Sequence, residues 1–180
     1  MVAANDFDTL ASAVAMAAAG DELAFARIVK AHQDDMSRVC YVICRDVDLA
    51  QDAVQQAWAI AWRELGGLRE PARLRSWLVA IAANEARQIM RRSRRREVVE
   101  LDLAHGPGAH VSDTTMWAQN VDLRNALGRL SPDDRALIAL RYVAGLDSFE
   151  LANVTGLSPS GTRARLARLL GTLRQELYDA

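Results

Sequence analysis

Three arginines, Arg163, Arg165 and Arg168, lie close together near the C-terminal end of the chain. An arginine guanidinium donates two parallel hydrogen bonds, a geometry that matches a guanine edge in the major groove or a phosphate group. The leucines around them recur at helical spacing and can bury one stripe of a helix, whereas the arginines fall off that stripe. The pattern predicts an amphipathic helix whose exposed side can bind nucleic acid, although an isolated helix of this kind is more often a solvated surface helix.

The residues around these arginines predict a helix-turn-helix. Ser148 is expected to cap the first helix, and Gly156 to end it in the left-handed conformation that glycine adopts without strain. Ser158 is expected to cap the second helix, with Pro159 at its first position, where a missing N–H has no cost. A solvated surface helix needs none of these signals, so we favour DNA binding. The start of the second helix meets base edges in such motifs, and the predicted contacts are Ser158, Ser160, Thr162, Arg163, Arg165 and Arg168.

Length and composition indicate the fold class. The chain has 180 residues, enough for one or two small domains, and 51% of them are hydrophobic, with many alanines and leucines that favour helix. We find no sustained alternation of β-branched residues that would indicate a strand, and we therefore predict an all-α protein. The net charge of −1 hides an uneven distribution, because residues 97–120 carry 4 acidic and no basic side chains while both flanking segments are slightly basic.

Periodicity and turn residues divide the chain into two small helical domains. Helices are expected at residues 8–19, 21–33, 36–44, 48–65 and 76–96, after which a Gly-Pro-Gly sequence and the acidic composition indicate a flexible linker. The helical pattern resumes near Asn120, and Ser131 followed by Pro132 is a strong helix start. The predicted segments are 1–21 (N-terminal segment), 22–96 (first domain), 97–119 (linker) and 120–180 (helix-turn-helix domain).

A second basic region combines arginines with an aromatic ring. Arg69, Arg73 and Arg75 precede Trp77, and a run of arginines follows up to Arg96. Basic side chains that follow the phosphates, beside a ring on which a base can stack, suit single-stranded nucleic acid. In the alternative interpretation Trp77 is a core residue and the arginines are a solvated helix end. The charge density of residues 91–96 favours an anionic partner, because like charges repel one another.

Other classes of chemistry find no support in the sequence. We find no phosphate-binding glycine loop, nucleophile elbow or metal-binding histidine pair, so we expect no enzyme, no cofactor and no small-molecule substrate. Cys40 and Cys44 lie in an apolar stretch and are expected to be buried rather than bound to a metal. Because we recognise neither a secretory signal nor a membrane-spanning run, we expect a cytoplasmic protein.

With these motifs, the chain resembles the extracytoplasmic-function (ECF) group of bacterial RNA polymerase sigma factors, within the sigma-70 superfamily. Residues 22–96 are similar to the second conserved sigma region through AFARIVKAH, DLAQDAVQQAWAIAW and LRSWLVAIAANEARQIMRR. Residues 120–178 are similar to the fourth region through LSPDDRALIALRYVAGLDSFELANVTGLSPSGTRARLARLLGTLRQEL. The order and spacing of these motifs, with a linker between them, make the resemblance specific.

The resemblance implies a transcription initiation factor that performs no covalent chemistry. The helix of residues 48–65 would dock on the β′ clamp coiled coil of core RNA polymerase through Asp48, Asp52, Gln55, Gln56 and Trp62. The loop of residues 66–76 would hold a flipped base of the −10 element, since a stacked base hides its pairing edge, and Asn84 and its helix would face the non-template strand. The −10 residues implied are Arg69, Arg73, Arg75, Trp77, Asn84, Arg87 and Arg91. The helix of residues 159–171 would read the −35 element as duplex DNA.

The implied partners are core RNA polymerase, including its β flap, promoter DNA and an anti-sigma factor. The chain departs from the usual family pattern at Gln55-Gln56, Ala83-Asn84, Gln88 and Gly161-Thr162, positions that bear on the polymerase contact and on promoter preference. The residues alone leave two other classes of protein possible. A helix-turn-helix repressor would use the C-terminal domain as a dimer on paired half-sites. A helical binding module would have no salt-dependent affinity for DNA.

Overall fold

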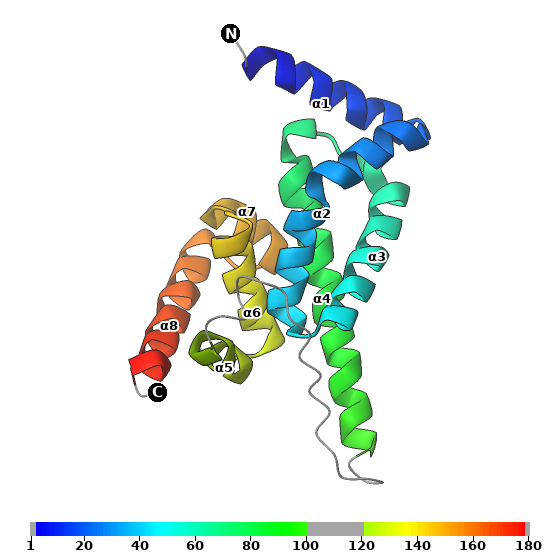
Figure 1. Ribbon diagram of the computed structural model, residues 1–180. Coiled ribbons are helices and arrows are strands. Elements are labelled where there is room, and N and C mark those ends of the chain that lie inside the picture. Colours follow the sequence, from blue (N-terminus) through cyan, green and yellow to red (C-terminus); the bar gives the residue numbers. More distant parts are fainter. Residues whose placement is uncertain (1–2, 101–120, 179–180) are drawn as a thin grey trace.

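Every regular element that the structure describes, in residues 3–100 and 121–178, is helical (Figure 1). In this computed structural model the N-terminal half consists of α1 (Ala3–Ala18), α2 (Glu22–Cys44), α3 (Val47–Glu64) and α4 (Leu74–Glu100). The C-terminal half consists of α5 (Val121–Arg129), α6 (Pro132–Ile138), α7 (Ser148–Thr155) and α8 (Pro159–Tyr178). The predicted all-α class is confirmed. Among the described helices, none is both long enough and apolar enough to cross a bilayer.

Helix α2 is one continuous helix where the sequence pattern suggested two. Its N-cap is Asp21, whose carboxylate accepts hydrogen bonds from two backbone N–H groups of the first turn, at 2.8 and 3.0 Å. The break expected after Gln33 does not occur, because no glycine or proline follows there and the polar residues cost little in a helix. The helix ends at Cys44, and its C-cap is Arg45, which adopts the left-handed conformation with φ of 61°.

Helix α4 is longer at both ends than the sequence indicated. Two 3₁₀ turns, Leu65–Gly67 and Pro71–Arg73, connect α3 to α4. Helix α4 then begins at Leu74, and it continues to Glu100, beyond the predicted start of the linker. Residues 101–120, which hold most of the predicted linker, lie outside the described residues.

Helices α7 and α8 form the predicted helix-turn-helix. The N-cap of α7 is Asp147 rather than Ser148, because Asp147 and Glu150 form a capping box in which each carboxylate accepts the other's backbone N–H, both at 2.9 Å. Gly156 ends α7 with φ of 71°, as expected. The hydroxyl of Ser158 accepts the N–H three residues on, at 3.0 Å, and so caps α8 as predicted.

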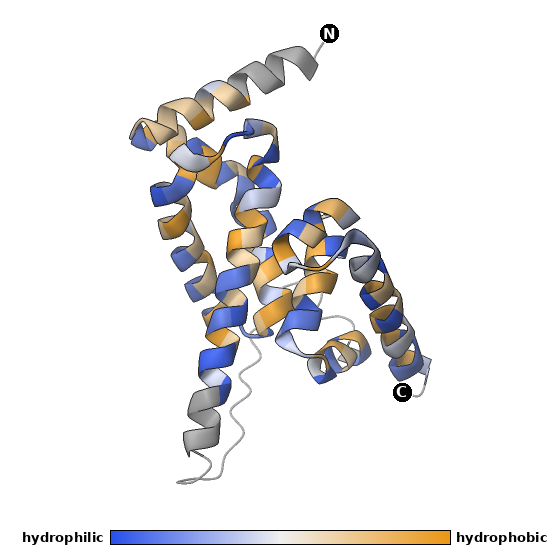
Figure 2. Cartoon of the chain, turned by 180° about the vertical axis from the view of Figure 1, so that it is seen from behind, coloured by the Kyte–Doolittle hydropathy of each residue, from blue (hydrophilic) through white to orange (hydrophobic). Residues whose placement is uncertain are grey.

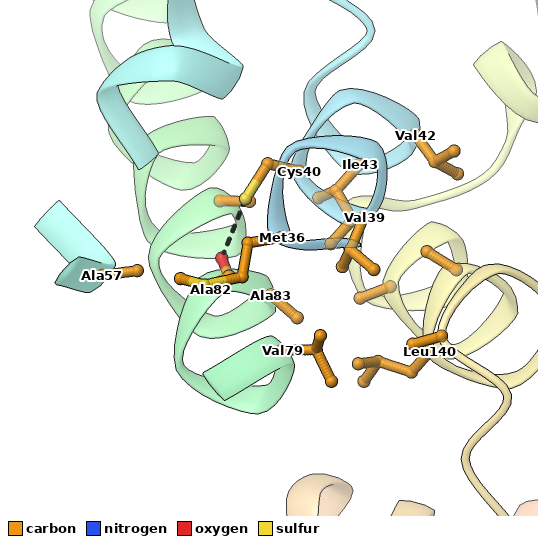
Figure 3. Close-up of a cluster of buried hydrophobic side chains, with 14 of the residues drawn as sticks. Met36, Val39, Cys40, Val42, Ile43, Ala57, Val79, Ala82, Ala83 and Leu140 are labelled. Carbon is orange, nitrogen blue, oxygen red and sulfur yellow. Dashed lines mark hydrogen bonds between the residues drawn. The ribbon is translucent and has the colours of Figure 1, made fainter. Parts of the chain in front are cut away.

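The two halves of the chain share one hydrophobic core. Figure 3 shows Met36, Val39 and Ile43 of α2 together with Val79 of α4 and Leu140, which belongs to the π-helical turn Ala139–Val143 after α6. All five side chains are almost fully buried. Figure 2 shows apolar residues gathered where the halves meet, whereas the part of α4 that extends beyond them is hydrophilic. The sequence predicted two domains on a tether, and the structure packs them face to face.

Cys40 and Cys44 are both free and buried, which confirms the predicted burial. The Cys40 thiol donates to the carbonyl oxygen of Ala82, with the sulfur 3.4 Å from that oxygen. Burial raises the pKa of both thiols, that of Cys44 to about 12, because an apolar environment disfavours the thiolate.

We expect both thiols to resist maleimide at pH 8 in the folded protein and to react once urea unfolds it. A raised pKa means that the protonated thiols contribute fully to stability at pH values below the ordinary thiol pKa of 9.0. For Cys44 this contribution is lost as the pH rises from that value toward about 12. Timed labelling followed by mass spectrometry measures the rates. Equal rates in the folded and unfolded protein would contradict the prediction.

Candidate nucleic-acid interfaces

The start of α8 presents most of the predicted −35 residues to solvent. Ser158, Ser160, Arg163 and Arg168 are all exposed along its first turns. The hydroxyl oxygens of Ser158 and Ser160 lie 3.1 Å apart. The N-terminal end of a helix carries partial positive charge, so these hydroxyls and guanidinium groups lie where a phosphate or a guanine edge is attracted.

Thr162 is the exception in the predicted −35 set, because it is 0% exposed. Within the described residues its hydroxyl has no hydrogen-bond partner. Thr162 lies on the same helical stripe as the buried Leu166, Leu169 and Leu173. The structure therefore removes Thr162 from the predicted DNA contacts. The spacing that identified the leucine stripe extends back to position 162, so the sequence contained the signal.

Arg165 is engaged within the C-terminal half. Its Nε and Nη2 atoms lie 2.9 and 2.8 Å from Oδ1 of Asp134, in the first turn of α6. About two fifths of the arginine side chain remains exposed. The guanidinium can therefore meet DNA only by leaving or sharing the carboxylate of Asp134.

Four of the predicted −10 residues line one groove. The groove has a volume of about 560 Å³ and lies between the end of α3, α4 and α7, with Arg73, Trp77, Asn84 and Arg87 in its walls. Trp77 is half-buried: its ring packs against the core and also borders the groove, which agrees in part with both interpretations of this residue. Oδ1 of Asn84 accepts a hydrogen bond from Nη2 of Arg87 at 3.0 Å. The groove thus offers a ring for stacking and an amide for a base edge.

Of the three loop arginines, only Arg73 lines this groove. Arg69 is exposed, and Arg73 pairs with Glu70 at 2.7 Å on the surface. Arg75 pairs with Asp35 of α2 at 2.7 Å and also donates to the carbonyl oxygen of Ala144 in the C-terminal half. Arg75 is therefore a contact between the two halves in this conformation, and it does not line the groove.

Two α4 arginines of the −10 set bind an acid of the C-terminal half. Nη1 of Arg87 lies 3.6 Å and Nη2 of Arg91 lies 3.0 Å from Oδ1 of Asp133. Burial lowers the pKa of Arg87, while the nearby charge of Asp133 acts in the opposite direction. Nε of Arg87 is buried without a hydrogen-bond partner among the described residues. This arginine is thus incompletely satisfied, and a further acceptor would stabilise it.

The predicted polymerase-binding residues form an open surface on α3. Asp48, Asp52, Gln55, Gln56 and Trp62 are all exposed. Trp62 is 39% exposed, and its ring meets Phe25 of α2 edge to face, with centroids 4.8 Å apart. In Figure 1, α3 lies on the opposite side of α2 and α4 from helices α5–α8.

Three consecutive functional candidates, Asp133, Asp134 and Arg135, were not predicted from the sequence. Ser131 and Pro132 indicated only a helix start, and the two acids lie in the first turn of that helix. Arg135 is 2% exposed, and its Nε donates to the carbonyl oxygen of Ile43 at 2.7 Å. These residues were missed because their partners are far away in the sequence, so local periodicity carries no signal for them.

Two family models match the chain and together cover both halves. Residues 28–96 match Sigma-70 region 2, and residues 120–173 match Sigma-70, region 4. The chain is 30% identical over 178 residues to the ECF RNA polymerase sigma factor SigM of Mycobacterium tuberculosis, covering 94% of this chain and 86% of that protein. It is 35% identical over 170 residues to the probable RNA polymerase sigma factor RfaY of Xanthomonas campestris pv. campestris, covering 91% of this chain.

The chain spans 42% of the length of the Xanthomonas protein. Among solved structures, CnrH in complex with the cytosolic domain of CnrY is similar, with a TM-score of 0.65 and 26% identity. That alignment covers 93% of this chain and 96% of that chain. The family models, the relatives and the helix-turn-helix agree with one another. The chain therefore belongs to the ECF sigma factors of the sigma-70 family, DNA-binding regulators of transcription, and is an alternative sigma factor that acts in promoter recognition and initiation.

Proposed function

We propose that the groove on α4 engages the −10 element as single-stranded DNA. The observation that carries this assignment is the groove itself, which combines the Trp77 ring, the Asn84 amide and the arginines Arg73 and Arg87. A base that has left the stack needs a face to stack on and a hydrogen-bonding group for its pairing edge. The arginines supply the positive charge that follows the phosphates. Arg69 follows the groove residue Leu68, and Arg91 lies one helical turn beyond Arg87, so both add to this charge.

The start of α8 reads the −35 element in the major groove of duplex DNA. Arg163 and Arg168 are exposed there and can reach base edges. The hydroxyls of Ser158 and Ser160 are also exposed and can donate hydrogen bonds to phosphate oxygens. Arg165 joins them after it releases Asp134. Base contacts of this kind decide which promoter is chosen, while phosphate contacts set the position of the helix.

Core RNA polymerase is a partner of the chain in addition to promoter DNA. The exposed residues of α3 dock on the β′ clamp coiled coil, and the C-terminal half docks on the β flap. An anti-sigma factor is a further partner, which the likeness to CnrH, solved with the cytosolic domain of CnrY, supports. The chain acts by binding, with no covalent chemistry and no small-molecule substrate. It works in the cytoplasm, where the polymerase is.

Co-purification with core RNA polymerase, followed by run-off transcription of a fragmented host genome, tests this function. We expect a stable complex and specific transcripts that share two upstream sequence elements. Core polymerase without the chain serves as the control. Failure to bind polymerase, with DNA binding retained, would indicate a helix-turn-helix repressor instead.

Asn84→Ala should impair promoter opening more than duplex binding. Loss of a specific base contact is worth about 1–3 kcal/mol, so we expect a roughly tenfold or larger loss of permanganate reactivity at the −10 element. Gel shifts on closed promoter DNA should change little. Asn125→Ala, an exposed asparagine of α5, is the matched control. An equal loss of opening and of duplex binding would contradict the separate role of Asn84.

A further inference from the structure

Four arginines from four different elements lie close together at the C-terminal end of α2. Arg45 is the C-cap of α2, Arg94 lies on α4, Arg124 on α5 and Arg135 on α6. Burial lowers the pKa of Arg45, and the neighbouring charge of Arg124 lowers it further. Burial likewise lowers the pKa of Arg135 to about 10, and the charges of Arg45 and Arg94 act in the same direction. We call these four residues the arginine cluster.

Arg45 occupies a backbone position that glycine usually takes. Its φ is 61°, and among the described residues every other positive φ belongs to a glycine. A helix that ends in this left-handed conformation commonly ends on glycine, because a Cβ is strained there. Backbone strain of this kind gathers at positions whose side chain has a role. The arginine at this position therefore points to a role for its guanidinium group.

Gly128 of α5 leaves the space in which that guanidinium lies. A Cβ at Gly128 would lie 2.7 Å from Cζ and 2.9 Å from Nη2 of Arg45, too close for packed atoms. Any larger residue would therefore displace the guanidinium group. Arg45 and Arg124 line one small cavity, and Arg45 is also exposed to solvent. Gly128 thus holds Arg45 beside Arg124 at the surface.

The carboxylates nearest to the cluster in the sequence are engaged elsewhere. Asp46 follows Arg45 and caps α3, where its Oδ1 accepts the N–H three residues on at 2.9 Å. Asp133 and Asp134 precede Arg135, and both pair with arginines outside the cluster. Among the side chains that the structure describes, no carboxylate forms an ion pair with the cluster.

The end of α2 offsets only a small part of the positive charge. Arg135 donates from Nε to the carbonyl oxygen of Ile43 at 2.7 Å and from Nη1 to that of Leu130 at 3.0 Å. The C-terminal end of a helix carries roughly half a negative charge, whereas each of the four guanidinium groups carries a full positive one. A multiply charged anion that bridges these groups would relieve their repulsion through charge-assisted hydrogen bonds.

We propose that the arginine cluster binds a small polyphosphate anion, such as the triphosphate group of a nucleotide. A nucleic-acid backbone needs basic groups spread along a track, whereas these four side chains converge from four elements. Arg45 and Arg94 are exposed, so an anion from solvent can reach them. This site is separate from the residues proposed above to bind promoter DNA and polymerase.

The cavity at the cluster indicates which part of such a ligand is recognised. Its volume is about 30 Å³, which is room for little more than one water molecule. A nucleobase does not fit there, so the phosphate groups alone are bound at its edge. We therefore expect ATP, GTP and inorganic tripolyphosphate to bind with similar affinity. Bound phosphate would join the elements that carry the arginines and raise the melting temperature of the chain.

The test is calorimetric titration of the full free chain with inorganic tripolyphosphate at constant ionic strength. Hydrogen bonds between charged groups are worth enough that losing two arginines should weaken binding by about tenfold or more. The cluster variant is Arg45→Gln with Arg124→Gln. The control, Arg27→Gln with Arg174→Gln, removes the same two charges from exposed positions, one in each half, and should bind like the native chain.

Equal affinity of the cluster variant and the control would overturn the proposal. Binding of sulfate as tight as that of tripolyphosphate would also overturn it, because a single small anion cannot bridge the cluster. If the double variant does not fold, Arg45→Gly replaces it. That change removes the guanidinium and relieves the left-handed strain, so its melting temperature without ligand should not fall. Its stabilisation by tripolyphosphate should be smaller than that of the native chain, and an undiminished stabilisation would count against the site.

Fluorescence anisotropy with a labelled DNA duplex of random sequence separates the two sources of phosphate. The cluster variant and the control should bind this DNA equally, since the cluster offers no track for a backbone. A loss of affinity for DNA in the cluster variant alone, with tripolyphosphate binding kept, would assign the cluster to nucleic acid and overturn the small anion. Neither measurement uses polymerase or a promoter, so failure here leaves the proposed function untouched.

Discussion

Arg163→Ala should weaken binding of the polymerase complex to promoter DNA by about 10- to 100-fold at the −35 element. A bidentate arginine–guanine pair discriminates by about 1–3 kcal/mol, and each 1.4 kcal/mol is a factor of ten in affinity. Arg163 is exposed near the start of α8, whereas Arg165 is already engaged with Asp134. Fluorescence anisotropy on native and scrambled −35 sequences, at one salt concentration, measures the loss and its dependence on sequence.

Arg174→Ala is the matched control for this experiment. It removes the same charge from an exposed position of the same helix, in its C-terminal part, away from the residues that meet base edges. We expect a small loss of affinity that is equal for native and scrambled sequences, because only long-range attraction to phosphate is changed. Core polymerase binding should be unaffected by either change. Loss of polymerase binding in Arg163→Ala would contradict a role confined to the −35 element.

The helix boundaries that the sequence predicted well are those with strong local chemistry. Gly156 takes a positive φ, and Ser158 with Pro159 begins α8, since capping depends on a few adjacent atoms. The cap of α7 was placed one residue late, because Asp147 and Ser148 are both good caps. Only the capping box between Asp147 and Glu150 shows which of the two residues is the N-cap. Such signals locate helices but say nothing of how the helices pack.

The arrangement of the two halves could not be predicted, because it depends on contacts between residues far apart in sequence. Nothing in the sequence around Ile43 or Arg135 indicates that one binds the other. Arginine is also a residue that is expected at the surface, so its burial here contradicts its average preference. The predicted −10 set is divided for the same reason, since Arg75 pairs with Asp35 outside the groove while Asn84 lines the groove.

Thr162 shows a different kind of error, which better use of the sequence would have avoided. Its place at the start of the second helix suggested a DNA contact. The leucine stripe of α8 passes through its position, so its side chain is buried. Periodicity should therefore outweigh position along the helix when the two signals disagree.

Leu140→Ala should destabilise the N-terminal half, although Leu140 lies in the C-terminal half of the chain. Leu140 is 1% exposed and packs into the core formed by α2 and α4 (Figure 3). Truncating a buried leucine costs about 2–5 kcal/mol of the free energy of unfolding. Because the halves share this core, we expect them to unfold as one cooperative unit, and we expect the loss to reach both.

Tryptophan fluorescence during urea unfolding tests this prediction. Trp58, Trp62 and Trp77 all belong to the N-terminal half, so Trp117→Phe makes the signal specific to that half. Leu140→Ala in this background should move the fluorescence midpoint and the circular dichroism midpoint together. The control Leu177→Ala makes the same change at a 41% exposed site and should cost about 0.5 kcal/mol or less. A fluorescence midpoint that does not move in Leu140→Ala would mean that the halves unfold independently of each other.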